Sequence, residues 1–390
     1  MPADLTPSEF HGTARPAAAV GSAPQAQTGR FYLPELDSLR FFAFLAVFIC
    51  HAFPHETAGY SKALPGPVVT WIAGAVRAGA FGVDLFFLLS SFLITSLLVR
   101  EHRQTGRIDV PGFWIRRCLR IWPLYILFVV AAGGVLPIWF HFIPKLATCY
   151  ALGLATFTHN WVVAFCGVGV GSPTLILWSV SLEEQFYLLW PVVIVLAGVK
   201  RLPLIAVWMI VFSIVARVVV IALNPPELML WCATPLRLEP IALGALLALA
   251  FDRLPHLNLR TRALMLVAGA AIPILFSALP FLTSKWVDAV KFPAVAAACG
   301  LVLLAVVGAE TKVFRLPLLV YLGKISYGLY VFHLLAIQFS PRLAIPGVPF
   351  GRAVSAFAVT VALAAVSYQW YERPFLRLKD RFAHVRSRPA

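Results

Sequence analysis

The feature that most constrains the fold of this chain is a succession of apolar runs separated by short polar connections, such as residues 80–99 and 202–222. Each run has about the 20 residues that a helix needs to cross the hydrocarbon core of a bilayer. Charged residues make up only 13% of the 390-residue chain, about half the share of a soluble domain. The sequence therefore predicts an all-α polytopic membrane protein.

About ten transmembrane helices are expected. The first follows residues 1–30 and precedes a polar connection with Pro54, Pro65 and Pro67, and the second begins near Ala80. The apolar part of residues 139–177 is too short to span, so this segment is predicted to be re-entrant or interfacial. The predicted spans lie near residues 36–51, 80–99, 121–138, 178–198, 202–222, 232–251, 263–282, 292–309, 317–340 and 351–370.

Basic residues set the predicted orientation. Six arginines lie between residues 100 and 120, and others occupy residues 200–201 and 373–388. Under the positive-inside rule these segments face the cytoplasm, which places both termini there and predicts a multi-pass inner-membrane protein surrounded by lipid. The net charge of +15 does not indicate nucleic-acid binding, because the cations are confined to short segments between apolar runs.

The predicted domain organisation is simple. Residues 1–30, rich in Ala, Pro, Gln and Gly, are expected to be a disordered tail, residues 31–376 the membrane domain, and residues 377–390 a basic cytoplasmic tail. With no repeat and no second folded domain, we expect a stand-alone form. The six cysteines have no metal-binding spacing, so neither a metal site nor a permanently bound cofactor is predicted.

The run Leu36–His51 carries ionisable residues that are costly in lipid. In a helix, Arg40 and His51 would lie only about 20° apart on one face and about 16 Å apart along the axis. Asp37 lies within i,i+3 reach of Arg40. One interpretation is a charged helix end that snorkels to the interface. The other is a functional group facing the bundle interior.

Further polar residues interrupt later runs. Asp84 lies inside the second predicted span, Glu183 begins the fourth, and Tyr330 and His333 share one helical face at i,i+3 in the ninth. For each of these residues taken alone, a structural hydrogen bond between helices is as good an explanation as catalysis. Together they exceed what helix packing requires.

Six segments, in order, resemble the membrane acyltransferase-3 family: LDSLRFFAFLAVFICH, GVDLFFLLSSFLI, FWIRRCLRIWPLY, WSVSLEEQFYLLWP, ISYGLYVFH and YERPF. The resemblance covers about residues 35–376. It implies ten transmembrane helices and transfer of an acyl group, usually acetyl from acetyl-CoA, to a hydroxyl of a sugar or another acceptor.

The resemblance also implies roles for individual residues. The family's arginine–histidine pair falls on Arg40 and His51, and its glutamate on Glu183. Its cluster that meets the CoA donor falls on three residues, namely Arg116, Arg117 and Arg120. The chain departs from the family at Ser90-Ser91-Phe92, where Ser-Gly-Phe is usual. A serine in place of that glycine is expected to tighten a helix contact.

The chemistry of the residues agrees with this resemblance. An alcohol is a poor nucleophile at neutral pH, and histidine is the side chain best matched to accept its proton, so His51 is the predicted base. An acyl-histidine intermediate is the alternative. Arg40 would orient polar groups, with Asp37 fixing it. Arginines suit bidentate contact with CoA phosphates, although a solvated cytoplasmic loop would look the same.

Three functions compete. The first is O-acylation of a surface or secreted glycan, with the donor entering from the cytoplasm and the acceptor approaching past Glu183 and residues 139–177. The second is acylation of a small natural product such as a macrolide. The third is a transporter or flippase of lipid-linked sugars, which often has an internal repeat. Acyl transfer that is lost in His51→Ala and retained in His333→Ala would favour the first.

Overall fold

The computed structural model describes residues 31–59, 65–139, 144–167, 172–253, 257–279, 282, 284–308, 312–343 and 350–382. This part of the chain is helical and contains no strand. The predicted tail at residues 1–30 lies outside the described residues.

The first half of the chain forms eight helices. They are α1 (Pro34–Ala52), α2 (Gly66–Ala78), α3 (Gly82–Thr105), α4 (Val110–Trp139), α5 (Pro144–Ala155), α6 (His159–Cys166), α7 (Leu177–Ala197) and α8 (Leu202–Ala222). The second half forms α9 (Glu227–Cys232), α10 (Leu238–Ala250), α11 (Leu259–Ala278), α12 (Asp288–Val306), α13 (Pro317–Lys324), α14 (Ser326–Leu343), α15 (Gly351–Val366), a π-helix (Ser367–Glu372) and α16 (Arg373–Lys379).

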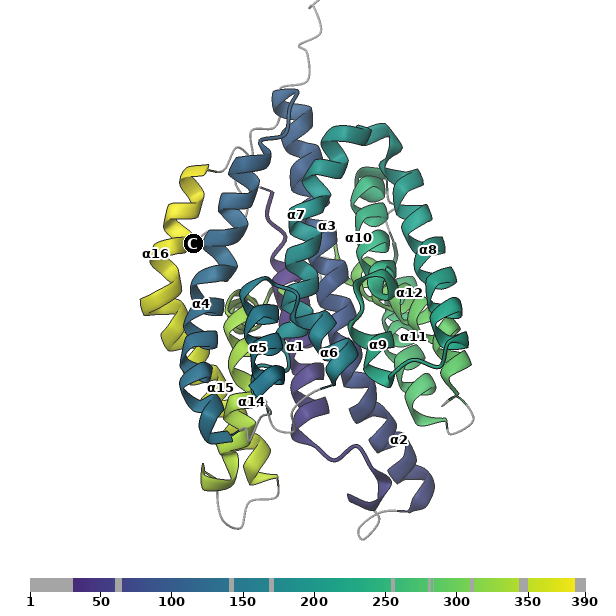
Figure 1. The fold of residues 1–390 in the computed structure, drawn as a ribbon. Helices are drawn as coiled ribbons and strands as arrows, with labels where there is room; N and C mark the ends of the chain where they lie inside the picture. The colour runs from purple at the N-terminus through teal and green to yellow at the C-terminus, as the bar shows by residue number, and fades with distance from the viewer. Residues whose placement is uncertain are drawn as a thin grey trace, which may run out of the picture.

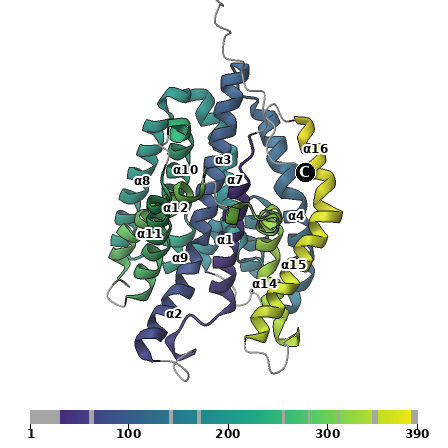
Figure 2. The same ribbon diagram turned by 180° about the vertical axis from the view of Figure 1, so that it is seen from behind.

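The helices form one bundle around α1, α3 and α7 (Figures 1 and 2). Helices α8, α10, α11 and α12 lie on one side of these three, and α4, α14, α15 and α16 lie on the other. The centre contains packed apolar side chains, among which Phe44 and Leu88 are completely buried. On the outside, apolar residues such as Val215 and Leu264 are more than half exposed. Apolar surface turned outward is expected of a bundle surrounded by lipid.

Seven helices among the described residues are long and apolar enough to cross a membrane. The pair α13 and α14 makes an eighth if it counts as one span bent by 72°. The other two predicted spans correspond to α1, which carries Glu35, Asp37 and Arg40, and to α4, of which residues 133–139 have no described side chains. The chain is an all-α polytopic membrane protein, and the count of ten stays a prediction.

The polar connection predicted before Ala80 is shorter than expected. A continuous helical stretch of 40 residues begins at Gly66 and runs through a short 3₁₀ turn into α3. Apolar residues before Ala80 pack α2 against α11, where a Cβ on Gly74 would come within 2.4 Å of the Cβ of Ala278. In the predicted re-entrant region the described helices, α5 and α6, have only 12 and 8 residues.

The junctions α3–α4 and α7–α8 lie at the same end of the bundle (Figures 1 and 2). The basic segments at residues 100–107 and 200–201 belong to these junctions. The clustering of cations at one end agrees with the predicted cytoplasmic face.

Candidate active site

Helix α1 places its two predicted functional residues at different depths of the bundle. Near its start, the Arg40 guanidinium pairs with the Asp37 carboxylate at 3.3 Å. The Tyr32 hydroxyl donates to the same carboxylate at 2.9 Å. Asp37 therefore holds Arg40, as predicted from the i,i+3 spacing, and both side chains are nearly buried.

At the other end of α1, the imidazole of His51 faces that of His333 in α14. The ring centroids are 5.2 Å apart, and His333 Nε2 lies 3.3 Å from His51 Nδ1. His333 is completely buried, and Tyr330 contacts its ring with centroids 5.5 Å apart. Two histidines 282 positions apart in the sequence thus form one unit. His333→Ala, the variant expected from sequence to retain acyl transfer, is therefore unsuitable as a control.

The hydrogen bonds of this unit assign both tautomers. Nδ1 of His51 lies 2.9 Å from the Val47 carbonyl oxygen, and Nδ1 of His333 lies 2.6 Å from that of Tyr330. A carbonyl oxygen only accepts, so each Nδ1 carries a proton in the neutral ring. The one proton on His51 Nδ1 is then shared between the Val47 carbonyl oxygen and His333 Nε2. The remaining lone pair of His51 is on Nε2, where a general base requires it.

Two adjacent cavities lie on the Arg40 side of the histidine pair. The basic cavity, with about 840 Å³ of empty space that includes open solvent, lies between α1, α3, α4 and α16, and its polar lining includes Tyr32, Arg40, Glu101, Arg117, Arg120 and Lys379. The inner cavity, with about 750 Å³ of such space, lies between α1, α3, α4, α7 and α14, and its polar lining includes Arg40, Ser90, Ser179, Glu183, Tyr187 and Tyr330. Arg40, Leu93, Arg117 and Arg120 line both.

Glu183 projects into the inner cavity from α7. Its carboxylate accepts a hydrogen bond from the Ser90 hydroxyl of α3 at 2.8 Å. Ser179, one turn earlier, hydrogen-bonds the Tyr330 hydroxyl at 2.7 Å, and that hydroxyl lies 3.2 Å from the Ile176 carbonyl oxygen. The inner cavity therefore has acceptors and hydroxyls along one wall and arginines along another.

The inner cavity approaches the histidine pair at Tyr330. The Tyr330 ring lines the cavity and contacts His333, while His51 lines neither cavity. Since His51 faces His333 within the bundle, its ring is not turned entirely to lipid. Arg40, Glu183 and Tyr330 thus line the inner cavity, and Tyr330 adjoins the pair formed by His333 and His51.

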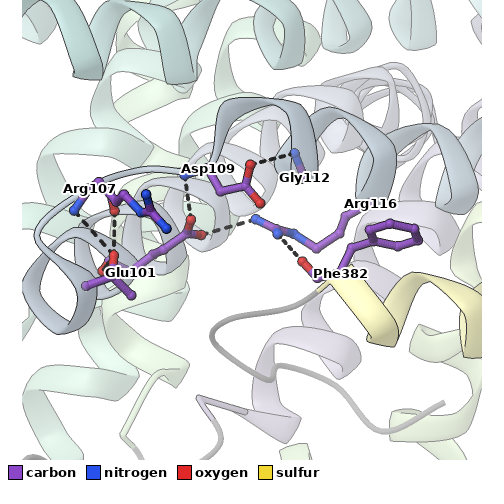
Figure 3. A network of polar contacts seen from close by, with 7 residues as sticks. Glu101, Arg107, Asp109, Gly112, Arg116 and Phe382 are labelled. Carbon is purple, nitrogen blue, oxygen red and sulfur yellow. Dashed lines mark hydrogen bonds and ion pairs between the residues drawn. The ribbon is translucent and has the colours of Figure 1, made fainter.

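Figure 3 shows the environment of Arg116, one of the three predicted phosphate-binding arginines. Arg116 pairs with Glu101 at 3.1 Å and donates to the Phe382 carbonyl. Glu101 also accepts from the Asp109 backbone N–H at 2.8 Å. Arg116 thus ties α3, the start of α4 and the C-terminal segment together, with one hydrogen bond from each of its two terminal nitrogens.

Asp84 lies apart from both cavities, in a buried set of ion pairs. Its carboxylate pairs with Arg237 at 2.7 Å, and Glu239 pairs with Arg217 at 2.5 Å. All four side chains are at most 2% exposed. Asp84 therefore joins α3 to the 3₁₀ turn Thr234–Arg237 that precedes α10. The role of Arg217 was not foreseen from sequence.

The departure at Ser91 is accommodated by the neighbouring helix. Ser91 is buried, and its hydroxyl donates to the Ile241 carbonyl at 2.6 Å. The close approach of α3 and α10 is made by Gly244, where a Cβ would come within 2.4 Å of the Leu88 carbonyl oxygen. Ser91 therefore adds a hydrogen bond at a contact that remains close.

Ser179, Tyr187 and Lys379 are among the cavity residues that sequence reasoning missed. Ser179 and Tyr187 flank Glu183 at four residues on either side, the spacing that places side chains on one helical face. That spacing could have found them. Lys379 carried no comparable signal, because it lies among the many cations of the C-terminal segment.

Comparison with known proteins now decides the family. A family model described as an acyltransferase domain matches residues 33–369, most of the chain. The chain belongs to the acyltransferase-3 family. The acyltransferase resemblance seen in the six motifs is thereby confirmed.

Relatives of this acyltransferase-3 chain carry O-acetyltransferase names. It is 28% identical to the peptidoglycan O-acetyltransferase OatA of Listeria monocytogenes, over 88% of this chain and 56% of the relative. It is 27% identical to the O-acetyltransferase OatA of Staphylococcus aureus strain NCTC 8325, over 88% and 57%. The chain thus spans little more than half the length of these relatives. No solved structure matches it.

Proposed function

We propose that the protein is an integral membrane O-acyltransferase that moves an acyl group, acetyl by default, from acyl-CoA to a hydroxyl of a glycan. The glycan would belong to the cell envelope or be secreted, and the enzyme would lie in the inner membrane. The OatA relative named for peptidoglycan O-acetylation supports this acceptor class.

The observation that carries the proposal is the order of three neighbouring features: a basic cavity, a polar inner cavity that shares Arg40, Arg117 and Arg120 with it, and a histidine pair that adjoins the inner cavity at Tyr330. A donor with a phosphorylated end and a reactive thioester end matches this order. Arg40, Arg117 and Arg120 line the passage, where they would counter the donor's negative charge.

His51 would act as the general base through Nε2. As the acceptor hydroxyl attacks the thioester carbonyl, its proton passes to Nε2 and gives an imidazolium. The tetrahedral intermediate collapses to the ester, the carbon–sulfur bond breaks, and the CoA thiolate leaves. The imidazolium then returns its proton to that thiolate.

His333 would act as a positioning residue for His51. Its Nε2 lone pair accepts from His51 Nδ1–H in the neutral ring and does so more strongly when His51 carries a positive charge. His333 thus orients the ring so that Nε2 presents its lone pair, in the way that a third group orients the base of a catalytic triad. Tyr330, packed on the His333 ring, connects this pair to the inner cavity.

The test uses membranes containing the full-length protein, labelled acetyl-CoA and a glycan acceptor. Ester-linked label in the glycan that is lost in His51→Ala supports the function. Movement of a lipid-linked sugar across vesicles without acyl transfer would contradict it and favour a transporter. Transfer to a macrolide but not to a glycan would assign the natural-product alternative.

A further inference from the structure

Another cavity, called here the apolar cavity, lies between α3, α10, α11 and α12, on the side of the bundle away from α14 (Figures 1 and 2). It shares no lining residue with the basic or the inner cavity. Eight of its nine lining residues are apolar, among them Phe92, Leu247, Met265 and Leu304, and the ninth is Arg262. Its empty space of about 550 Å³, which includes open solvent, lies in the range of ligand pockets.

The apolar cavity adjoins the end of the bundle that carries the basic segments. Phe251, which lines the cavity after the end of α10, contacts the ring of Phe92 with centroids 5.5 Å apart. The next residue, Asp252, pairs with Arg103 of α3 at 2.8 Å and with Arg100 at 3.4 Å. The cavity therefore lies beside the predicted cytoplasmic face, where the apolar run of α10 gives way to charged residues.

Arg262 fixes the rim of this cavity. Its Nη1 donates to the carbonyl oxygens of Ala305 at 3.1 Å and Val307 at 2.9 Å, at the end of α12. Its Nε donates to the Leu257 carbonyl oxygen at 3.1 Å. Such bonds satisfy carbonyl groups that the end of a helix leaves without partners. They hold α11 at a set distance from α12, so the space between these helices is part of the fold.

The outer surface beside the cavity is apolar. Leu264 and Val267, on either side of the cavity residue Met265 in α11, are 62% and 66% exposed. In a bundle surrounded by lipid, this surface contacts hydrocarbon chains. Water in the apolar cavity would lose hydrogen bonds, whereas hydrocarbon loses none. The occupant that suits this lining is therefore an acyl chain.

Two cations beside the cavity specify the charge of the occupant. Arg253 lies two residues after Phe251, and Arg260 lies two residues before Arg262. Both arginines are exposed, and among the described residues neither has a hydrogen bond or an ion pair. Basic pockets between helices on the cytoplasmic side bind anionic lipid headgroups. A lipid with a negative headgroup thus complements both the arginines and the apolar lining.

We propose that the apolar cavity binds one acyl chain of an anionic phospholipid of the cytoplasmic leaflet, with the headgroup phosphate held by Arg253 and Arg260. Burial of the methylene groups supplies affinity, and the two arginines select the negative headgroup. The bound lipid packs between α3, α10, α11 and α12, and it is separate from the histidine pair and its two cavities.

The test measures lipid binding by native mass spectrometry of the purified full-length protein, with phosphatidylglycerol or phosphatidylcholine of identical chains. Met265→Trp fills the cavity and is expected to raise the Kd for phosphatidylglycerol about tenfold, the equivalent of about two methylene groups. Leu264→Trp is the matched control, because it adds the same ring at the neighbouring exposed position and should leave the Kd unchanged.

The headgroup contact is tested separately. Arg253→Gln and Arg260→Gln should each weaken phosphatidylglycerol binding roughly fivefold and leave phosphatidylcholine binding unchanged. Arg201→Gln removes an exposed cation at the α7–α8 junction, outside the cavity lining, and should change neither.

Each result decides for or against the site. An unchanged Kd for phosphatidylglycerol in Met265→Trp overturns it, and so does an equal loss in Met265→Trp and Leu264→Trp, which would indicate general contact of lipid with α11. Equal affinity of the unaltered protein for the two lipids overturns the headgroup contact. Should Met265→Trp fail to fold, the arginine variants decide, because they alter only exposed side chains: an unchanged Kd in both contradicts the proposal, and a loss that Arg201→Gln does not share supports it.

Discussion

Removing the acceptor nitrogen of His333 gives the sharpest test of the histidine pair. His333→Leu leaves His51 Nδ1–H with only the Val47 carbonyl, whereas His333→Gln can place an amide oxygen near the position of the lost Nε2. We expect the leucine variant to lose kcat with little change in the KM for acetyl-CoA. The glutamine variant should recover part of the rate.

The magnitude follows from the geometry. A hydrogen bond to a charged group is worth about 1.5–3 kcal/mol, and the 3.3 Å separation favours the lower part of that range. About 1.5–2 kcal/mol corresponds to a loss of kcat of roughly 10- to 30-fold. The partial recovery expected of the glutamine variant distinguishes this contact from packing.

The assay is label transfer from acetyl-CoA, with folding checked by size-exclusion chromatography of the purified variants. A structural defect alone would lower the amount of active protein without changing kcat per folded molecule. Full activity in His333→Leu would refute the role of His333. Equal loss of rate in the leucine and glutamine variants would show that hydrogen-bond acceptance is not what matters.

Three further outcomes are expected. Asp84→Ala should destabilise the protein by about 3–5 kcal/mol, because it leaves the buried Arg237 guanidinium without its carboxylate, and the thermal midpoint in detergent should fall. Asp252→Ala is the control: it breaks only exposed ion pairs and should change the midpoint little. Gly323→Ala should abolish folded protein in membrane extracts, since its Cβ would come within 1.8 Å of a backbone oxygen of α1; normal yield would contradict that packing. In a background without native cysteines, His55→Cys should be labelled by an impermeant reagent from outside the cell and Arg103→Cys only after the membrane is opened; the reverse would invert the proposed topology.

Much of the site could be predicted because its residues are conspicuous against an apolar background. A charged or titratable side chain in a span is costly, so Arg40, His51, Asp84, Glu183 and His333 stand out on physical grounds alone. The helical period then joined Asp37 to Arg40, a pair that the structure contains at 3.3 Å. The six motifs gave the family, which the match over residues 33–369 confirmed.

Contacts between distant segments could not be read in this way. The i,i+3 and i,i+4 rules describe one helix, whereas His51 meets His333 and Asp84 meets Arg237 across the bundle. Each of these partners was visible as an isolated polar residue, and nothing in the local pattern states which other helix supplies its counterpart. The position of Lys379 in the lining of the basic cavity likewise depends on how the C-terminal segment packs against α4.

The amino-acid sequence by itself determined that this chain is a helical membrane protein of the acyltransferase-3 family, because apolar length and local motifs are properties of single segments. Tertiary structure alone decided which polar groups share an environment, and hence that Asp84 is structural while His333 adjoins His51. The physical reason is that burial makes an unpaired polar group costly, and the packing of separate helices determines which partner satisfies it.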